Sequence, residues 1–187
     1  RAAGFYNTLM QSNDPAMVIE CLNGYRTKEK LPNNIGEFRT PLGVVETTKE
    51  GKDITIVTYG STWKVVMDAA NNLEKIGISC EVIDTQTLVP FDISQDIIDS
   101  VKKTNRLLVV DEDVPGGASA YILQKITEDQ KAYNYLDSAP QTLSAKEHRP
   151  PYGKDGDYFT KPSAEDIFEK VYSIMNEVNP NLFPEIY

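Results

Sequence analysis

The sequence predicts an α/β fold, a three-layer αβα arrangement in which helices cover both faces of a mostly parallel sheet. The main observation is a strand, a helix and a second strand in immediate succession between Asp53 and Asp92. Short, β-branched apolar runs flank a segment of helical periodicity, which is typical of strands buried on both faces. A strand-helix-strand unit of this length closes as a right-handed parallel crossover, so we expect a mostly parallel sheet.

The central unit is expected to begin with a strand at residues 54–59 and to end with a strand at residues 80–83. The helix between them is predicted to start after Ser61, whose side chain can cap free N–H groups, and to stop at Gly77 in a left-handed conformation. Its buried face should comprise the apolar residues at helical spacing: Val65, Val66, Ala69, Ala70, Leu73 and Ile76.

The residues before this unit are of three kinds. Residues 1–10 are predicted to form a helix with neither a cap nor an initiator Met before it, so we expect a piece of a longer protein. Residues 16–22 follow an Asn-Asp-Pro turn and are a strand candidate. Residues 23–42 are rich in Gly, Pro, Asn and charge without any period, which indicates a linker. Residues 43–48 form a second, short strand candidate.

The residues after the unit continue the alternation of helices and strands. We expect a helix whose inner face carries Ile93, Ile97, Ile98 and Val101, a buried strand at residues 107–110, a helix at 118–131 after Gly116-Gly117, and a short strand around Leu143. Residues 146–161 are predicted to be a charged loop. Ser163 and Asp166 form a capping-box pattern at the start of the last helix.

Charge and composition exclude several classes of function. The chain has 19 Lys and Arg residues against 28 Asp and Glu residues, a net charge of −9, which repels nucleic acid and anionic membrane surfaces. No apolar run approaches the roughly 20 residues of a membrane-spanning helix. We therefore expect a soluble cytoplasmic protein. Cys21 and Cys80 lie in apolar runs without a metal-binding spacing, which predicts buried, reduced thiols.

Candidate chemistry should gather where the parallel strands end, at residues 59–61, 84–86 and 111–113. No dinucleotide or phosphate-loop fingerprint is present there. The acidic run 111–113 could hold Mg²⁺ as in a receiver domain, but solvated acids beside a helix are the favoured interpretation. Gly116-Gly117 indicates close backbone packing rather than anion binding. His148 is the only candidate general base, and it is expected to be an ordinary surface residue.

The run IDTQTLVPFD at residues 83–92 resembles the IDLRTLxPxD element of the C-terminal domain of E1 β subunits in thiamine-diphosphate-dependent 2-oxoacid dehydrogenases, which are transketolase-like enzymes. Gln86 departs from the usual Arg. Residues 13–20 are similar to the family's DNNPVVVLE stretch. The resemblance implies that residues 1–22 are the final helix and strand of a truncated pyrimidine-binding domain, residues 23–42 a linker, and residues 43–187 a transketolase-like C-terminal domain.

The resemblance also implies a division of labour. The parent enzyme would decarboxylate pyruvate or a branched-chain 2-oxoacid with thiamine diphosphate and Mg²⁺, both held by other domains. This chain would carry no catalytic or cofactor-binding residue and would be inactive alone. Some family members bind K⁺, and the matching positions here are Leu9, Met10, Ser12 and Asp14. Ser12 stands where the pattern has Asp, which weakens that site electrostatically.

The partners implied are an E1 α-type domain, a second E1 β domain and the peripheral subunit-binding domain of E2. Residues 135–140 resemble the turn that presents a carboxylate to E2, and Asp137 is the candidate contact, with a solvated turn residue as the alternative. Dimer contacts are expected on helix faces near Trp63 and residues 118–126. Two other interpretations stay open: the C-terminal domain of a transketolase or deoxyxylulose-phosphate synthase, and a stand-alone doubly wound binding module.

Overall fold

The computed structural model describes residues 1–186 and contains a five-stranded sheet in the order β1-β3-β2-β4-β5. Strand β2 (Ile54–Thr58) pairs in parallel with both β3 (Cys80–Asp84) and β4 (Leu107–Val110). Strand β5 (Gln141–Leu143) is parallel to β4, and β1 (Glu46–Lys49) is an antiparallel edge strand beside β3. The mostly parallel sheet and the central crossover unit are thus confirmed.

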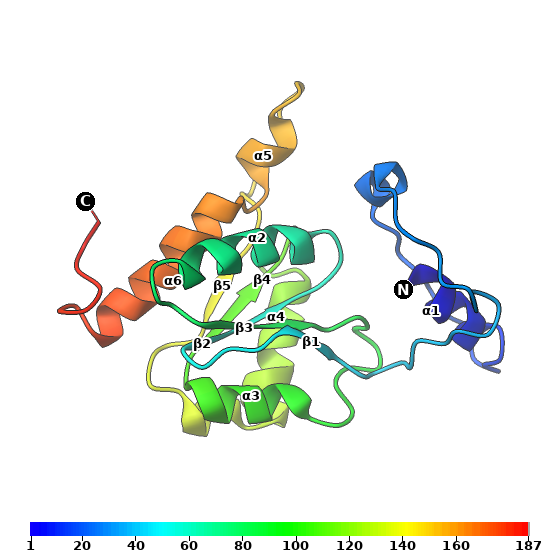
Figure 1. Ribbon diagram of the computed structural model, residues 1–187, viewed down its shortest axis with the longest axis horizontal. Helices are drawn as coiled ribbons and strands as arrows, with labels where there is room; N and C mark the ends of the chain where they lie inside the picture. The colour runs from blue at the N-terminus through cyan, green and yellow to red at the C-terminus, as the bar shows by residue number, and fades with distance from the viewer. Residues whose placement is uncertain (187) are drawn as a thin grey trace.

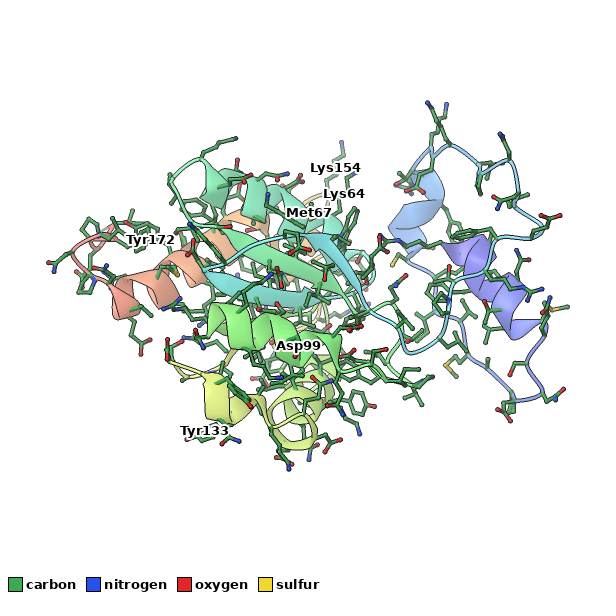
Figure 2. The ribbon with its side chains drawn as sticks, turned by 60° about the horizontal axis from the view of Figure 1, so that its bottom comes forward. Lys64, Met67, Asp99, Tyr133, Lys154 and Tyr172 are labelled. Carbon is green, nitrogen blue, oxygen red and sulfur yellow. The ribbon has the colours of Figure 1, made fainter. Side chains whose placement is uncertain are left out.

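Helices cover both faces of this sheet (Figure 1). Helices α2 (Thr62–Glu74) and α6 (Ala164–Val178) pack on one face, and α3 (Asp96–Thr104) and α4 (Ala118–Gln124) on the other. Figure 2 shows Met67 and Tyr172 on the first side and Asp99 and Tyr133 on the second. Each face has its own buried apolar cluster, because β2, β3 and β4 are buried on both sides.

Several details differ from the sequence-based expectation. The helix predicted at residues 118–131 is α4 followed by a π-helix, η2 (Lys125–Asp129), and the chain then forms a 3₁₀-helix, η3 (Ala132–Tyr135). Ile76 is exposed because α2 ends before it, although Gly77 takes the expected left-handed conformation at φ +87°. Ile93 is also exposed, because α3 starts only at Asp96.

Residues 146–161, which we call the arm, project from the domain in Figure 1. They were predicted as a loop, but they contain the short helix α5 (Gly156–Thr160). The capping box of α6 is present as predicted: Ser163 Oγ accepts the Asp166 N–H at 3.1 Å, and Asp166 Oδ2 accepts the Ser163 N–H at 2.8 Å.

Residues 1–42, called the N-terminal segment, lie beside the domain (Figure 1). Helix α1 (Ala2–Leu9) is present as predicted, and residues 35–40 fold back onto it. The strand predicted at residues 16–22 is wrong. Met17 and Ile19 are 87% and 84% exposed, and the run lies beside no strand in the described residues, so it has no ladder to join.

The chain after this run forms a 3₁₀-helix, η1 (Leu22–Arg26). Cys21 is only half-buried, contrary to expectation, because the run that carries it is not part of the sheet. Cys80 is buried in β3 as predicted, and burial raises the pKa of its thiol to about 12. Both cysteines are free thiols.

Candidate functional site

The carboxyl ends of the three central strands meet at one edge of the sheet, because β2 is parallel to both β3 and β4. Residues 59–61, 84–86 and 111–113 therefore gather there, as the sequence predicted. This carboxyl edge carries three polar clusters, centred on Asp111, Glu112 and Asp84. Each joins residues from elements that are far apart in the sequence.

Asp111 is completely buried, contrary to the expectation of a solvated acid. Its Oδ1 accepts hydrogen bonds from the Tyr59 hydroxyl at 2.6 Å and the Asp113 N–H at 3.0 Å, and its Oδ2 accepts the Ser119 N–H at 2.8 Å. Burial, and then the bond to Asp111, raises the pKa of Tyr59, which keeps that hydroxyl a donor. Because both oxygens of Asp111 are occupied, this residue braces the turn between β4 and α4.

Glu112 accepts hydrogen bonds from Ser61 Oγ at 2.7 Å and from Lys161 Nζ at 2.9 Å. Burial works to raise the pKa of Glu112, but the two donors outweigh it and hold the pKa below its ordinary value. Ser61 was predicted to cap α2 with its side chain, and that is wrong because the hydroxyl is committed to Glu112. A carboxylate neutralised by Lys161 is a weak base, so Ser61 is not an activated nucleophile.

Asp84 is held by Arg1, which also contacts Glu46 and Trp63. The guanidinium thus ties the N-terminal segment to β1, to the end of β3 and to α2 in a single cluster. Burial raises the pKa of Asp84 in spite of hydrogen bonding from Gln86 and the charge of Arg1.

The remaining candidates for chemistry are structural. The close backbone packing predicted for the glycine pair is not found: a Cβ on Gly117 would lie 2.5 Å from the side-chain oxygen Asp113 Oδ2, and a Cβ on Gly116, which has φ +88°, would meet nothing within 4 Å. His148 is exposed in the arm, with its ring centroid 5.6 Å from that of Phe159, as expected of a surface residue. Within residues 1–186, no group of three or more His, Cys, Asp or Glu side chains is arranged to hold a metal ion.

Two hollows stand out, and both lie away from the carboxyl edge. One, of about 290 Å³, lies between α2, α6 and Ile186, and the other, of about 380 Å³, is formed by residues 151–156 and Phe159 of the arm. Neither is lined by the carboxylates described above. In the part of the chain that the structure describes, no helix is long and apolar enough to cross a membrane.

The residues expected to bind K⁺ follow one another at the end of α1. The Leu9 carbonyl accepts the Ser12 N–H at 3.0 Å, and Ser12 Oγ accepts the Asp14 N–H at 3.2 Å. The side chain of Met10 is exposed. Two of the expected oxygen ligands are thus engaged in local hydrogen bonds, and the K⁺ site stays a prediction.

Asp137 lies at the opposite edge of the sheet, where the strands begin. Its N–H donates to the carbonyl of Asn105, two residues before β4, at 2.9 Å. Its carboxylate is 62% exposed and lies 4.0 Å from the Arg106 guanidinium. Lys102 lies over the Tyr135 ring at 5.6 Å from its centroid. The structure therefore separates Asp137 from the three clusters of the carboxyl edge.

Comparison with known proteins identifies the family of the domain. The family described as transketolase, C-terminal domain, matches residues 43–167, more than half of the chain. The chain belongs to this family. A solved structure of a split-gene transketolase, described as an inactive β4 tetramer, has a TM-score of 0.58 at 22% identity, over 74% of this chain and 43% of that one. This likeness confirms the transketolase C-terminal fold.

Curated relatives confirm the resemblance to E1 β subunits. The chain is 34% identical over 172 residues to the pyruvate dehydrogenase E1 component subunit beta of Rickettsia conorii, covering 91% of the chain and 51% of that relative. It is 40% identical over 146 residues to the mitochondrial 2-oxoisovalerate dehydrogenase subunit beta of Dictyostelium discoideum, covering 76% of the chain and 38% of that relative. The chain thus spans about half the length, or less, of these relatives.

Sequence reasoning missed several residues of this transketolase C-terminal domain and its attached segment. Arg1, Glu46 and Trp63 were not connected with Asp84, and Lys161 was not connected with Glu112. No local pattern could have revealed these contacts, because the residues in contact are 45 or more positions apart. A buried strand that ends on an acidic residue was the one usable signal that a cation lies nearby.

Proposed function

We propose that this chain is the C-terminal region of the β-type part of a 2-oxoacid dehydrogenase E1 component, acting in the oxidative decarboxylation of pyruvate or a branched-chain 2-oxoacid. The observation that carries the proposal is the similarity of 91% of the chain to pyruvate dehydrogenase E1 β subunits. Relatives of both pyruvate and 2-oxoisovalerate dehydrogenases match, so they do not select the substrate. The cytoplasmic location stays a prediction.

A domain exchange tests this proposal. Residues 43–186 would replace the matching part of the Rickettsia conorii E1 β subunit, and pyruvate decarboxylation would be measured with its partner subunit. We expect the chimera to assemble and to keep activity within about tenfold, since it supplies a scaffold rather than reacting groups. The matched control carries the corresponding domain of the split-gene transketolase, which shares the fold. A folded chimera that fails to assemble, or is no more active than the control, would contradict the proposal.

The chain's own part in the reaction is structural. Thiamine diphosphate and Mg²⁺ do not fit the carboxyl edge, because Asp111 has both oxygens hydrogen-bonded and Glu112 is neutralised by Lys161. We propose that other domains of the parent enzyme hold the cofactor and that this chain alone is inactive. Calorimetric titration of the chain with thiamine diphosphate in the presence of Mg²⁺ should give no binding heat. Micromolar affinity would overturn this part of the proposal.

E2 docking is the second role that we propose. Asp137 offers an exposed carboxylate to a basic partner, and the acidic net charge favours such a partner through long-range attraction. Asp137→Lys should weaken binding of an E2 peripheral subunit-binding domain by about tenfold or more in surface plasmon resonance. Asp99→Lys is the matched control, because Asp99 is 73% exposed on neighbouring α3. Equal affinity for both variants and the parent chain would contradict this role.

Assembly with an E1 α-type domain and a second E1 β domain is the third proposed role. The faces expected near Trp63 and residues 118–126 do not supply large exposed apolar groups, because Ile122 and Ile126 are buried in the domain's own core. Exposed apolar side chains occur elsewhere, among them Met10, Met17, Ile19, Leu22, Tyr25, Leu31, Val89 and Ile93. We propose that the partner domains cover residues of this second set, because large exposed apolar side chains are candidates for interface contacts.

A further inference from the structure

A covalent and a polar connection join the N-terminal segment to the domain at two places, beside a van der Waals contact of Cys21, whose Sγ lies 3.4 Å from the position of a Cβ on Gly60. One is covalent, at Gly43, whose N–H donates to Thr87 Oγ1 at 2.8 Å and whose carbonyl accepts the Ile93 N–H at 2.8 Å. The other is the side chain of Arg1. Among the residues that the structure describes, Arg1 makes the only hydrogen bond and the only ion pairs between residues 1–42 and residues 43–186.

The Arg1 guanidinium occupies a pocket built from three elements. Nη2 pairs with Glu46 Oε2 of β1 at 2.8 Å, and Nη1 donates to Asp84 Oδ2 at the end of β3. Cζ lies 5.4 Å from the centroid of the Trp63 ring on α2. A planar fork that bridges two carboxylates and lies over an aromatic ring fits a guanidinium better than an ammonium.

The pocket needs a cation because of how the sheet is built. Glu46 and Asp84 are directly opposite each other in the β1-β3 register, and like charges in that position destabilise a sheet. The Asp84 carboxylate is only 9% exposed, and its second oxygen is already used by the Gln86 N–H at 3.0 Å. Without Arg1, the site would hold a nearly buried, unpaired carboxylate beside a second negative charge, which is strongly unfavourable.

The aromatic wall of the pocket is fixed in place. Trp63 Nε1 donates to Thr48 Oγ1 at 2.9 Å, and Thr48 Oγ1 donates to the Val82 carbonyl at 3.2 Å. The ring is thereby tied through β1 to β3 and cannot turn away from the guanidinium without breaking these bonds. The pocket is preorganised by the domain, and Arg1 is the one part contributed by the N-terminal segment.

Arg1 is also firmly connected to the rest of its segment. It directly precedes α1, where the Thr40 N–H donates to the Gly4 carbonyl at 3.1 Å and Thr8 Oγ1 donates to the Thr40 carbonyl at 2.7 Å. Asn7 Nδ2 donates to the carbonyls of Ile35 and Phe38, both at 2.7 Å. These bonds make α1 and residues 35–40 one unit. Because Arg1 belongs to this unit, its contacts with Glu46, Asp84 and Trp63 fix the position of the unit on the domain.

We propose that Glu46, Asp84 and Trp63 form a guanidinium-binding pocket, and that Arg1 in this pocket is a latch that holds the N-terminal segment on the transketolase C-terminal domain. Gly43 and its two hydrogen bonds are the fixed end of the connection. Opening the latch frees residues 1–40 to move about residues 41–42 while the domain keeps its fold.

Distance measurement between two spin labels tests the latch. Lys30→Cys in the segment and Asn71→Cys on α2 are exposed labelling positions, in a background with Cys21→Ser, which keeps the size of the side chain beside Gly60. Cys80 can remain, because it is buried and its pKa of about 12 keeps it a protonated thiol. We expect one narrow distance distribution for the parent chain. Arg1→Gln and Asp84→Asn should each lower the ratio of docked to undocked molecules by about tenfold, as loss of a charged hydrogen bond predicts.

Further variants separate the latch from a general loss of charge. Arg1→Lys should restore only part of the docked population. Adding Asp84→Asn to Arg1→Gln should change nothing further, because Asp84 contacts the segment only through Arg1. Arg39→Gln removes another exposed cation from the segment and should leave the distribution unchanged. Trp63 is the only tryptophan, so its emission should shift in the two latch variants and not in Arg39→Gln.

Arg1→Gln tests whether Arg1 holds the segment on the domain even if Asp84→Asn weakens the sheet, because Arg1→Gln leaves every contact within residues 43–186 in place. A parent-like distance distribution for Arg1→Gln would overturn the proposal. Full restoration by Arg1→Lys would overturn its guanidinium-specific part. Neither result bears on the 2-oxoacid dehydrogenase assignment, which the domain exchange tests separately.

Discussion

The N-terminal segment and the domain that follows it are held together by different forces. In residues 43–186, two buried apolar clusters lie on the two faces of the sheet. In residues 1–42, the buried residues among those described are Gly4 and Thr40, neither of which has a large apolar side chain. Helix α1 and residues 35–40 are instead held together by hydrogen bonds from side chains to backbone carbonyls. The domain is therefore expected to fold by itself, whereas the segment depends on its attachments.

The sharpest test of this contrast applies the same substitution to both regions. Leu73→Ala removes a fully buried side chain from the cluster beneath α2 and should lower the free energy of unfolding by about 2–5 kcal/mol. Leu22→Ala, at a position that is 80% exposed, should change it by less than about 0.5 kcal/mol. Urea unfolding followed by circular dichroism measures both. Similar losses would show that the segment has a core of its own.

The ends of the helices give a second contrast. Ser163 caps α6 through a capping box, whereas α1 has no side-chain cap. Ser163→Ala should reduce the stability of the domain by about 1 kcal/mol in the same urea assay. Ser173→Ala, on the exposed face of α6, is the control and should be neutral or slightly stabilising, because alanine is the better helix former. A loss of equal size at Ser173 would mean that the cap contributes nothing special.

Gly4 tests whether α1 and residues 35–40 are one unit. Replacing a helical glycine with alanine usually stabilises a helix by about 1 kcal/mol, but a Cβ here would lie 2.3 Å from Thr40 Oγ1. Gly4→Ala should therefore loosen residues 35–40 and speed tryptic cleavage at Lys28, Lys30 and Arg39 by about fivefold.

The domain's urea midpoint should not change in Gly4→Ala, because the clash lies outside residues 43–186. Gly36→Ala is the matched control, since a Cβ at Gly36 meets nothing within 4 Å. Cleavage of Gly4→Ala at the parent rate would argue against the close packing of α1 on Thr40.

The smallest expected effect is the loss of the stability that Glu112 contributes as the pH falls. Because the pKa of Glu112 is lower in the folded state than its ordinary value, its contribution to stability is present above that value and is lost as the pH falls through the folded pKa. Glu112→Gln should be less stable than the parent at pH 7, and the difference should shrink towards zero in acid. Unfolding in urea at several pH values measures this. A difference that does not depend on pH would exclude the ion pair as its cause.

Glu20→Gln completes the comparison between the two regions. The pKa of Glu20 is also lowered, by hydrogen bonds from Tyr25 and Tyr6, but all three residues belong to the segment. Loss of the Glu20 carboxylate should leave the free energy of unfolding of the domain unchanged at every pH. A shift in the domain's midpoint would mean that the two regions unfold together.

The same contrast explains what the sequence could predict. Strands β2, β3 and β4 were recognisable because strands buried on both faces are rich in apolar residues without strict alternation, as in the run Leu107–Val110. Helix α6 was recognisable because its capping box and apolar face are local. The apolar run at residues 16–22 misled, because an apolar run forms a strand only where a neighbouring strand offers its backbone.

The candidate site was only partly predictable. The gathering of residues 59–61, 84–86 and 111–113 follows from the parallel topology alone. Their pairing does not: the burial of Asp111 depends on Tyr59 and Ser119, and the hydroxyl of Ser61 turns to Glu112 instead of capping α2. The side-chain partners of these charged residues lie far away in the sequence, so the sequence shows the charges but does not show which groups they contact.

The positions of Arg1 and Asp137 at opposite ends of the strands have a consequence for assembly. If Asp137 docks E2 as proposed, the partner would not compete for space with the N-terminal segment, which contacts the domain through Arg1 at the other end of the strands. Strand β4, at four residues and about 3.3 Å per residue, is about 13 Å long, and Asp137 lies at the start of this strand whereas Arg1 lies at the end of β3, two strands away.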